Sequence, residues 1–198
     1  MPYPQIPDSY IRQAVIQGIN FRAHEQWFTW ILSSHYDFSE KVQTEIGELV
    51  SKAKYKDDSS SVLRLKTIVR HAALQLRQMP NDDFAFAKLD VVMAVPSFDP
   101  KDISLPHVAG KEISEALSIL DYSSFVRKKV DSAKAKLNPS VNPAAYEILR
   151  SLDGLNVLIV DDLFHTGSTL ESVAIKVREA GAKSVTGFCL TKVNKGLN

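Results

Sequence analysis

Residues 157–170, Val-Leu-Ile-Val-Asp-Asp-Leu-Phe-His-Thr-Gly-Ser-Thr-Leu, place two adjacent acids before a short turn rich in hydroxyl groups. The four apolar residues predict a buried strand that carries Asp161 and Asp162 at its carboxyl end. The turn around Gly167 then leads into a helix, whose first backbone N–H groups can bind an anion. Ligands of open α/β sheets bind at the carboxyl ends of strands. The segment therefore predicts a site for a phosphate beside hydroxyl groups or a metal ion, which is the combination that a sugar phosphate requires.

Three simpler explanations stand beside this one. Ser168 and Glu171 have the spacing of a capping box, which would only start a helix. Residues 95–98, Val-Pro-Ser-Phe, also suit an ordinary turn, and residues 127–129, Arg-Lys-Lys, suit a solvated run of charges. The capping box explains neither acid, so the ligand site remains the favoured interpretation of residues 157–170.

The elements around this segment predict an α/β fold. Apolar runs predict strands at 90–95, 156–161 and 184–192, and helical spacing predicts helices at about 108–120 and 169–180. We expect a further strand within 124–130, a mobile loop over 131–143 and a helical turn within 144–150. Strands that alternate with helices indicate a parallel sheet flanked by helices.

The first part of the chain has a helical pattern. We expect helices over 9–36, over 39–53 with Ser39 as the N-cap, and through Leu65–Leu76 to a stop near Pro80. Residues 1–80 are thus expected to form a helical cap or flank on an α/β core at 81–198, as one compact unit. The aromatic cluster of this part is favoured as core, with a cover for an acceptor base or a homodimer surface as alternatives; it comprises Trp27, Phe28, Trp30, Tyr36 and Phe38.

Composition bounds the class of protein. The 198 residues are 44% hydrophobic and 24% charged, which is ordinary for a globular domain. A net charge of +1 provides no global field to attract DNA or an acidic membrane. Cys189 is the single cysteine, so an intrachain disulfide and a zinc ribbon are excluded. With no signal or membrane segment in the pattern, we expect a soluble cytoplasmic protein that makes no membrane contact.

The ordered pattern of 157–170 resembles the ribose-phosphate loop of type I phosphoribosyltransferases. Further features resemble the ComF-like subgroup of that superfamily: Lys-Tyr-Lys-Asp-Asp at 54–58, the Val95-Pro96 turn, the basic strand near Arg127 and the Asn-Pro segment. The chain departs from the family at His165, where a small residue or threonine is usual. It also lacks the subgroup's zinc ribbon, and has Ser-Leu-Pro-His-Val-Ala at 104–109 in place of the arginine-glycine-phenylalanine-asparagine signature.

The resemblance implies a role for each part of the site. Asp161 and Asp162 would hold the ribose hydroxyls of phosphoribosyl pyrophosphate and act in catalysis. The 5′-phosphate would bind to His165, Thr166, Gly167, Ser168 and Thr169. The pyrophosphate loop would be Val95, Pro96, Ser97 and Phe98, with further contacts from Arg127, Lys128 and Lys129. Mg²⁺ would be held mainly by ligand oxygens, with Asp161 and Asp162 as its protein ligands.

Two functions follow from the resemblance. One is a Mg²⁺-dependent phosphoribosyltransferase of nucleotide metabolism, a pentosyl glycosyltransferase that uses phosphoribosyl pyrophosphate or a ribose-5-phosphate nucleotide with an unidentified acceptor, a nucleobase among the candidates. The alternative is a non-catalytic ComF-like accessory or ligand-sensing protein of competence and DNA uptake, with DNA or a helicase as partner. Nucleic-acid binding has weak support, because only Phe125 accompanies the basic run as a stacking aromatic residue. P-loop and dinucleotide folds are excluded, because their glycine motifs are missing.

Overall fold

A computed structural model describes residues 17–20, 28–37, 42–56, 58–78, 88–97, 104–129 and 141–193. Its centre is a six-stranded sheet with the order β1-β2-β10-β9-β5-β6. The strands, in this order, are Gln17–Asn20, Phe28–Ser34, Ser184–Lys192, Asn156–Phe164, Val91–Ala94 and Leu120–Asp121. The five strands β2, β10, β9, β5 and β6 are parallel to one another. Strand β1 pairs with β2 in the antiparallel sense at the edge of the sheet. The expected α/β class with a parallel sheet is confirmed.

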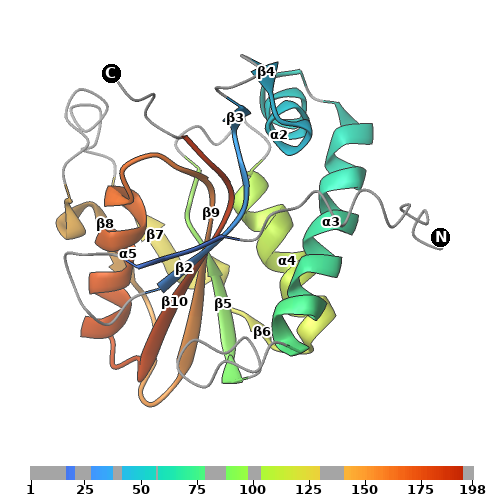
Figure 1. Ribbon diagram of the computed structural model, residues 1–198. Helices are drawn as coiled ribbons and strands as arrows, with labels where there is room; N and C mark the ends of the chain where they lie inside the picture. The colour runs from blue at the N-terminus through green and yellow to red at the C-terminus, as the bar shows by residue number, and fades with distance from the viewer. Residues whose placement is uncertain are drawn as a thin grey trace.

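Helices cover both faces of the sheet (Figure 1). One face carries α2 (Glu45–Tyr55), α3 (Ser59–Gln78) and α4 (Leu105–Leu117). The other carries α5 (Ser168–Glu179) and the antiparallel pair β7 (Val126–Lys128) and β8 (Tyr146–Ile148). The remaining elements are β3 (Tyr36–Asp37), β4 (Val42–Gln43) and 3₁₀ turns at Ser123–Phe125 and Pro143–Ala145. No helix of the described residues is long and apolar enough to span a bilayer.

The alternation of side chains along the strands fills the two cores. Leu158 and Val160 of β9 join the core under α2, α3 and α4, whereas Val157 and Ile159 join the core under α5. All four are buried. A parallel strand covered on both faces is apolar at consecutive positions, which explains the uninterrupted run in the sequence.

The expected helix over 9–36 is wrong where the structure describes the chain. Residues 17–20 form β1, and Phe28–Ser34 form β2, which pairs in parallel with β10. Ile31 faces the α5 core and Leu32 faces the opposite core, so both neighbours are buried. A short apolar run suits a buried strand as well as a buried helix, and pairing with β10 decides for the strand. Residues 9–16 and 21–27 lie outside the described part.

Most other expected elements are present, with shifted ends. The helix of α3 stops at Gln78, and α5 and β10 occupy their expected ranges. The N-cap of α2 is Thr44, while Ser39 lies outside the described residues. The helical turn expected within 144–150 is wrong at 146–148, where β8 pairs with β7.

Two residues at the start of α2 dock this helix on the carboxyl end of β2. The Thr44 hydroxyl accepts from the backbone N–H of Gly47 at 3.0 Å and donates to the carbonyl of Ser34 at 2.5 Å. Gly47 lies so close to the carbonyl of His35 that an added Cβ would be 2.1 Å from its oxygen. These contacts place the amino-terminal helix at the edge of the sheet where the strands end.

Candidate functional site

Backbone hydrogen bonds bring the carboxyl ends of the parallel strands together. The N–H of Val95, just after β5, donates to the carbonyl of Val160 on β9 at 2.8 Å. Val193, just after β10, donates to Phe164 at 2.9 Å, and His35, just after β2, donates to Lys192 at 2.7 Å. The expected pyrophosphate turn therefore lies beside the strand that carries the acids, at the sheet edge where α/β proteins bind ligands.

The two acids of β9 point to opposite faces of the sheet. β9 continues to Phe164, so the alternation of an extended strand includes both acids. Asp161 follows Val157 and Ile159 on the α5 side, and Asp162 follows Leu158 and Val160 on the α2 side. Both residues are nearly buried, with exposures of 8% and 9%. Each acid therefore has a different set of neighbours.

Asp162 forms an ion pair with the amino-terminal helix. Nζ of Lys54, in the last turn of α2, donates to Oδ2 of Asp162 at 2.6 Å. Burial acts to lower the pKa of Lys54, but the charge and hydrogen bond of Asp162 outweigh it and the pKa is raised. Lys54 therefore remains an ammonium ion beside Asp162.

Asp161 lies in a less polar setting. Burial, and next the charge of Asp162, raise the pKa of Asp161 to about 8. Burial and the nearby Asp161 also raise the pKa of Tyr146 on β8 to about 12. The Lys128 ammonium lies 5.9 Å from the centre of the Tyr146 ring and acts electrostatically on Asp161. The β7–β8 pair thus contributes both a neutral hydroxyl and a cation to the Asp161 side.

The turn after β9 has the form of an anion site. Gly167 is the N-cap of α5, with φ of +82°. As a glycine it has no side chain that could form a capping hydrogen bond to the helix. The Thr166 hydroxyl donates to Oγ of Ser168 at 3.0 Å. A side-chain hydrogen bond joins Thr169 to Tyr146, which links this turn to the Asp161 side. The backbone N–H of Ser168 donates to the same Thr166 hydroxyl at a long 3.4 Å, and Gly167 itself adds no side-chain cap. A helix start of this kind can bind an anion through its backbone N–H groups.

The capping box is not the form that this segment adopts. Ser168 is the first residue of α5 and not its N-cap, and the backbone N–H of Glu171 donates to the carbonyl of Gly167 at 2.9 Å. The Ser172 hydroxyl bridges the first turn to the β8 side, because it donates to the carbonyl of Ser168 at 2.6 Å and accepts from Asn142 N–H at 2.8 Å. Helix initiation alone does not explain the hydroxyl-rich turn.

A chain of hydrogen bonds supports the backbone of Asp162. The Thr191 hydroxyl donates to the Asp162 carbonyl at 3.3 Å, and Nδ1 of His35 lies 3.2 Å from the same hydroxyl oxygen. Because Thr191 donates to a carbonyl, Nδ1 of His35 is the donor to Thr191. Nε2 then accepts from Gln43 at 3.3 Å, and Gln43 also donates to Ser51 of α2 at 2.9 Å. The chain joins β10, the end of β2 and α2 around one acid.

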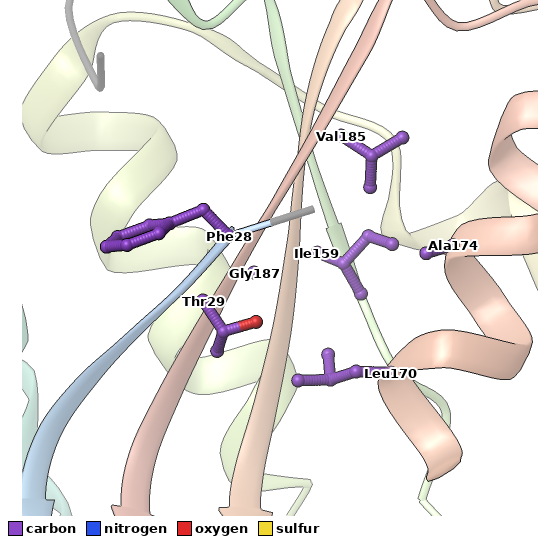
Figure 2. A pocket seen from close by; sticks show the side chains of 7 residues that line it. All are labelled: Phe28, Thr29, Ile159, Leu170, Ala174, Val185 and Gly187. Carbon is purple, nitrogen blue, oxygen red and sulfur yellow. The ribbon is translucent and has the colours of Figure 1, made fainter. Parts of the chain in front are cut away.

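A small apolar pocket lies apart from the acids (Figure 2). It lies between α5 and the β2–β10–β9 part of the sheet, and its lining is Phe28, Thr29, Ile159, Leu170, Ala174, Val185 and Gly187. Thr29 contributes the one hydroxyl of this lining and no residue in it is charged. This chemistry does not suit a phosphate, so the candidate site is the strand edge at Asp161 and Asp162.

Comparison with known families agrees with this geometry. Residues 109–197 match the family model described as "Phosphoribosyl transferase domain". The match covers less than half of the 198-residue chain. The matched part contains the acids of β9, the turn at 165–169 and the β7–β8 pair, whereas Lys54 and residues 95–98 precede it.

The individual proteins that this chain resembles are distant from it. A ribose-phosphate pyrophosphokinase of Pyrococcus abyssi (strain GE5 / Orsay) is 33% identical over 75 residues, which are 38% of this chain and 23% of that protein. The chain thus matches about a quarter of the length of this curated relative. Among solved structures, a purine phosphoribosyltransferase from Pyrococcus horikoshii Ot3 gives a TM-score of 0.42 at 21% identity over 66% of this chain and 72% of that one. An adenine phosphoribosyltransferase gives 0.48 at 19% identity, over 68% and 75%.

The structure brings only part of the expected site together. Val95, Pro96 and Ser97 lie beside the end of β9, and Lys128 lies near Asp161. Arg127 and Lys129 are exposed, because neighbouring residues of β7 alternate between faces. His165 and Thr166 are exposed at the start of the turn. Phe98 lies outside the described residues.

Four residues of the site were not expected from the sequence: Lys54, His35, Tyr146 and Thr191. Lys54 had one signal, since it opens the Lys-Tyr-Lys-Asp-Asp stretch that resembles the ComF-like subgroup. The other three have ordinary neighbours in the sequence. Their contacts arise between separate elements, which no local pattern predicts.

The donor set bears on how a metal ion could bind at this edge of the sheet. The described residues contain no group of three or more His, Cys, Asp or Glu side chains arranged to hold a metal. Asp161 and Asp162 are the carboxylates at the strand edge, and Lys54 already binds one of them. These residues fit a Mg²⁺ ion that takes most of its ligands from a bound pyrophosphate and water, and do not form a cage of their own.

Proposed function

We propose that this protein binds phosphoribosyl pyrophosphate and transfers its phosphoribosyl group to an acceptor. The observation that carries the proposal is the junction of β9 with α5, where two acids precede a hydroxyl-rich turn with Gly167 at the N-cap of the helix. The acids suit the ribose hydroxyls, because carboxylates accept strong hydrogen bonds. The turn suits the 5′-phosphate, because backbone N–H groups and hydroxyls converge there.

The proposed reaction is a substitution at the ribose C1 atom. The bond from C1 to a pyrophosphate oxygen breaks, a bond from C1 to the acceptor forms, and pyrophosphate leaves with the bonding electrons. The Asp162 carboxylate, and Asp161 when it is ionised, would stabilise the positive charge that develops on the ribose ring. Mg²⁺, when bound, would neutralise the pyrophosphate. Val95–Ser97 and Lys128 are proposed to flank that group, since they lie next to the acids.

Calorimetric titration with phosphoribosyl pyrophosphate, with and without Mg²⁺, tests the binding step. We expect heat of binding with the native protein and a large loss when Asp161→Asn and Asp162→Asn are combined. Asp153→Asn is the matched control, because Asp153 is exposed and precedes the opposite end of β9. Absence of binding under both metal conditions would overturn the proposal. Release of pyrophosphate across a panel of nucleobases then tests the reaction and identifies the acceptor.

A second candidate function is ligand binding at the same strand-edge site without a chemical reaction, as in a ligand sensor or a ComF-like accessory protein. The feature that favours it is the exposed charge of Arg127 in β7 and of Lys129 just after β7, near the half-buried ring of Phe125. A gel-shift with single-stranded DNA over a salt series tests this candidate, because phosphate contacts weaken steeply with salt. DNA binding without pyrophosphate release would favour it over the transferase.

A further inference from the structure

Lys54 contacts the acid pair from a helix outside the matched family domain. Its ammonium lies 2.6 Å from Oδ2 of Asp162, and the two side chains are 28% and 12% exposed. A pair in this setting is less screened by water and salt than a surface pair. Asp162 therefore has a cation partner that belongs to the chain itself.

The position of Lys54 is determined by the docking of α2. Thr44 caps the helix and bonds to Ser34, and Gly47 contacts the backbone of His35. The Gln43 amide adds a hydrogen bond to Ser51 within the helix. The start of α2 is thus tied directly to the end of β2, and its middle is tied through Gln43 of β4, which also contacts His35. With the helix held in this way, its last turn brings Lys54 to the strand edge.

Charged and titratable groups surround the acids from every packed element. Asp162 is approached by Lys54 of α2 and His35 after β2, and Asp161 by Lys128 of β7 and Tyr146 of β8. Cys189 of β10 is a further neighbour of both acids. The Lys54 ammonium is in direct hydrogen-bonded contact with Asp162.

We propose that Lys54 is a positioning residue for the ribose end of the site. It holds Oδ2 of Asp162 at the sheet edge and balances the charge there, so that Oδ1 accepts from a ribose hydroxyl. This inference rests on the proposed function. It assigns the recognition of the sugar to a residue of the amino-terminal helix. It also implies that sugar recognition at Asp162 needs no metal ion.

Loss of the ammonium has a defined consequence at this end of the site. Without Lys54, the Asp162 carboxylate would be largely buried and without its ammonium partner, which is unfavourable for a charged group. The Asp162 side chain would then turn toward water, and its Oδ1 atom would no longer be placed to accept from the ribose hydroxyl. The turn at 165–169 is held by its own hydrogen bonds and would retain its affinity for phosphate.

The test compares two ligands that differ by the sugar. Ribose 5-phosphate and inorganic phosphate are titrated calorimetrically into the full chain in EDTA. For Lys54→Met we expect about tenfold weaker binding of ribose 5-phosphate, equivalent to about 1.4 kcal/mol, with unchanged binding of phosphate. Lys54→Arg should restore most of the loss. Lys52→Met is the matched control, since Lys52 pairs with Glu48 along the same helix.

A double variant separates positioning from direct contact. If Lys54 acts through Asp162, Lys54→Met should add no further loss to Asp162→Asn. Additive losses would mean that Lys54 contacts the ligand, which would overturn the positioning role. If Lys54→Met fails to fold, Lys54→Gln takes its place, because it keeps a donor without the charge.

The remaining outcomes distinguish this inference from the proposed function. Native protein that binds ribose 5-phosphate, with Lys54→Met binding it equally well, overturns the inference alone. Native protein that binds ribose 5-phosphate only with Mg²⁺ also overturns it, because the cation at Asp162 is then a metal. Native protein that binds phosphate but not ribose 5-phosphate or phosphoribosyl pyrophosphate overturns both.

Discussion

The backbone N–H of Asp162 donates to Oδ1 of Asp161 at 2.9 Å, while the Asp162 side chain pairs with Lys54 on the other face of the sheet. Two neighbours of the same type therefore differ in their surroundings. Burial, followed by the charge of Asp162, raises the pKa of Asp161 to about 8. Burial thus favours the protonated form of Asp161, whereas the Asp162 side chain pairs with the Lys54 ammonium.

Asp161→Asn should make the protein more stable at alkaline pH. The ordinary pKa of 3.8 applies in the unfolded chain, and the folded chain retains the proton up to about pH 8. The folded state therefore binds more protons in this interval, so stability falls as pH rises from about 4 to about 8. We expect the variant to gain roughly 1–3 kcal/mol over the native protein near pH 8.5 and less near pH 5.

Urea unfolding at these two pH values measures the effect of Asp161→Asn. The asparagine oxygen still accepts from the Asp162 N–H, so the turn is preserved in the variant. An equal change in stability at both pH values would contradict the raised pKa. If Asp161 also serves the ribose, the stabilised variant should bind phosphoribosyl pyrophosphate more weakly, as expected for a site that trades stability for function.

Gly167→Ala should weaken phosphate binding and stability together. Gly167 has φ of +82°, a conformation that costs an alanine about 1–2 kcal/mol. The strain would distort the turn at 165–169, whose backbone N–H groups are proposed to bind the 5′-phosphate. Gly154→Ala is the control, because Gly154 has φ of +74°, open space around its Cβ position and a place outside the site. Thermal unfolding should show a similar loss for both variants, and phosphate titration a loss for Gly167→Ala only.

Gly47→Ala should displace α2 from the end of β2. An added Cβ would lie 2.1 Å from the carbonyl oxygen of His35, so the helix must move, at a cost of about 1–3 kcal/mol. Gly110→Ala in α4 is the matched control, since its Cβ would meet no atom closer than 3.5 Å. That variant should be neutral or more stable, because alanine favours helix. Urea unfolding compares the two, and equal effects would contradict the docking of α2 through Gly47.

Cys189 should resist thiol reagents while the protein is folded. It is fully buried in β10, and burial raises the pKa of its thiol well above the ordinary value, with the charges of Asp161 and Asp162 adding to the effect. The thiolate is the reactive form, so both access and reactivity are low. Reaction with a colorimetric disulfide reagent should be absent in buffer and rapid in denaturant. Rapid labelling in buffer would place Cys189 outside the core.

In the amino-terminal part, the sequence pattern did not predict the secondary structure correctly. Trp30 and Ile31 have spacings that suit a helix, yet they belong to β2 and face opposite cores. A buried parallel strand has no period-2 signal, because both faces are apolar. The helical interpretation succeeded for α3, since its apolar residues lie on one face over many turns.

By itself, the sequence determined the β9–turn–α5 unit and the residues in it. That unit is continuous in the chain, and its apolar run, acids, glycine and amphipathic helix are local properties. Only the tertiary structure decided which partner each acid receives. Lys54 and Asp162 are 108 positions apart, and they meet because α2 docks at the end of β2, two strands from β9 in the sheet. Alternation along β9 then directs Asp161 to the opposite side, so the chain order alone could not distinguish the two acids.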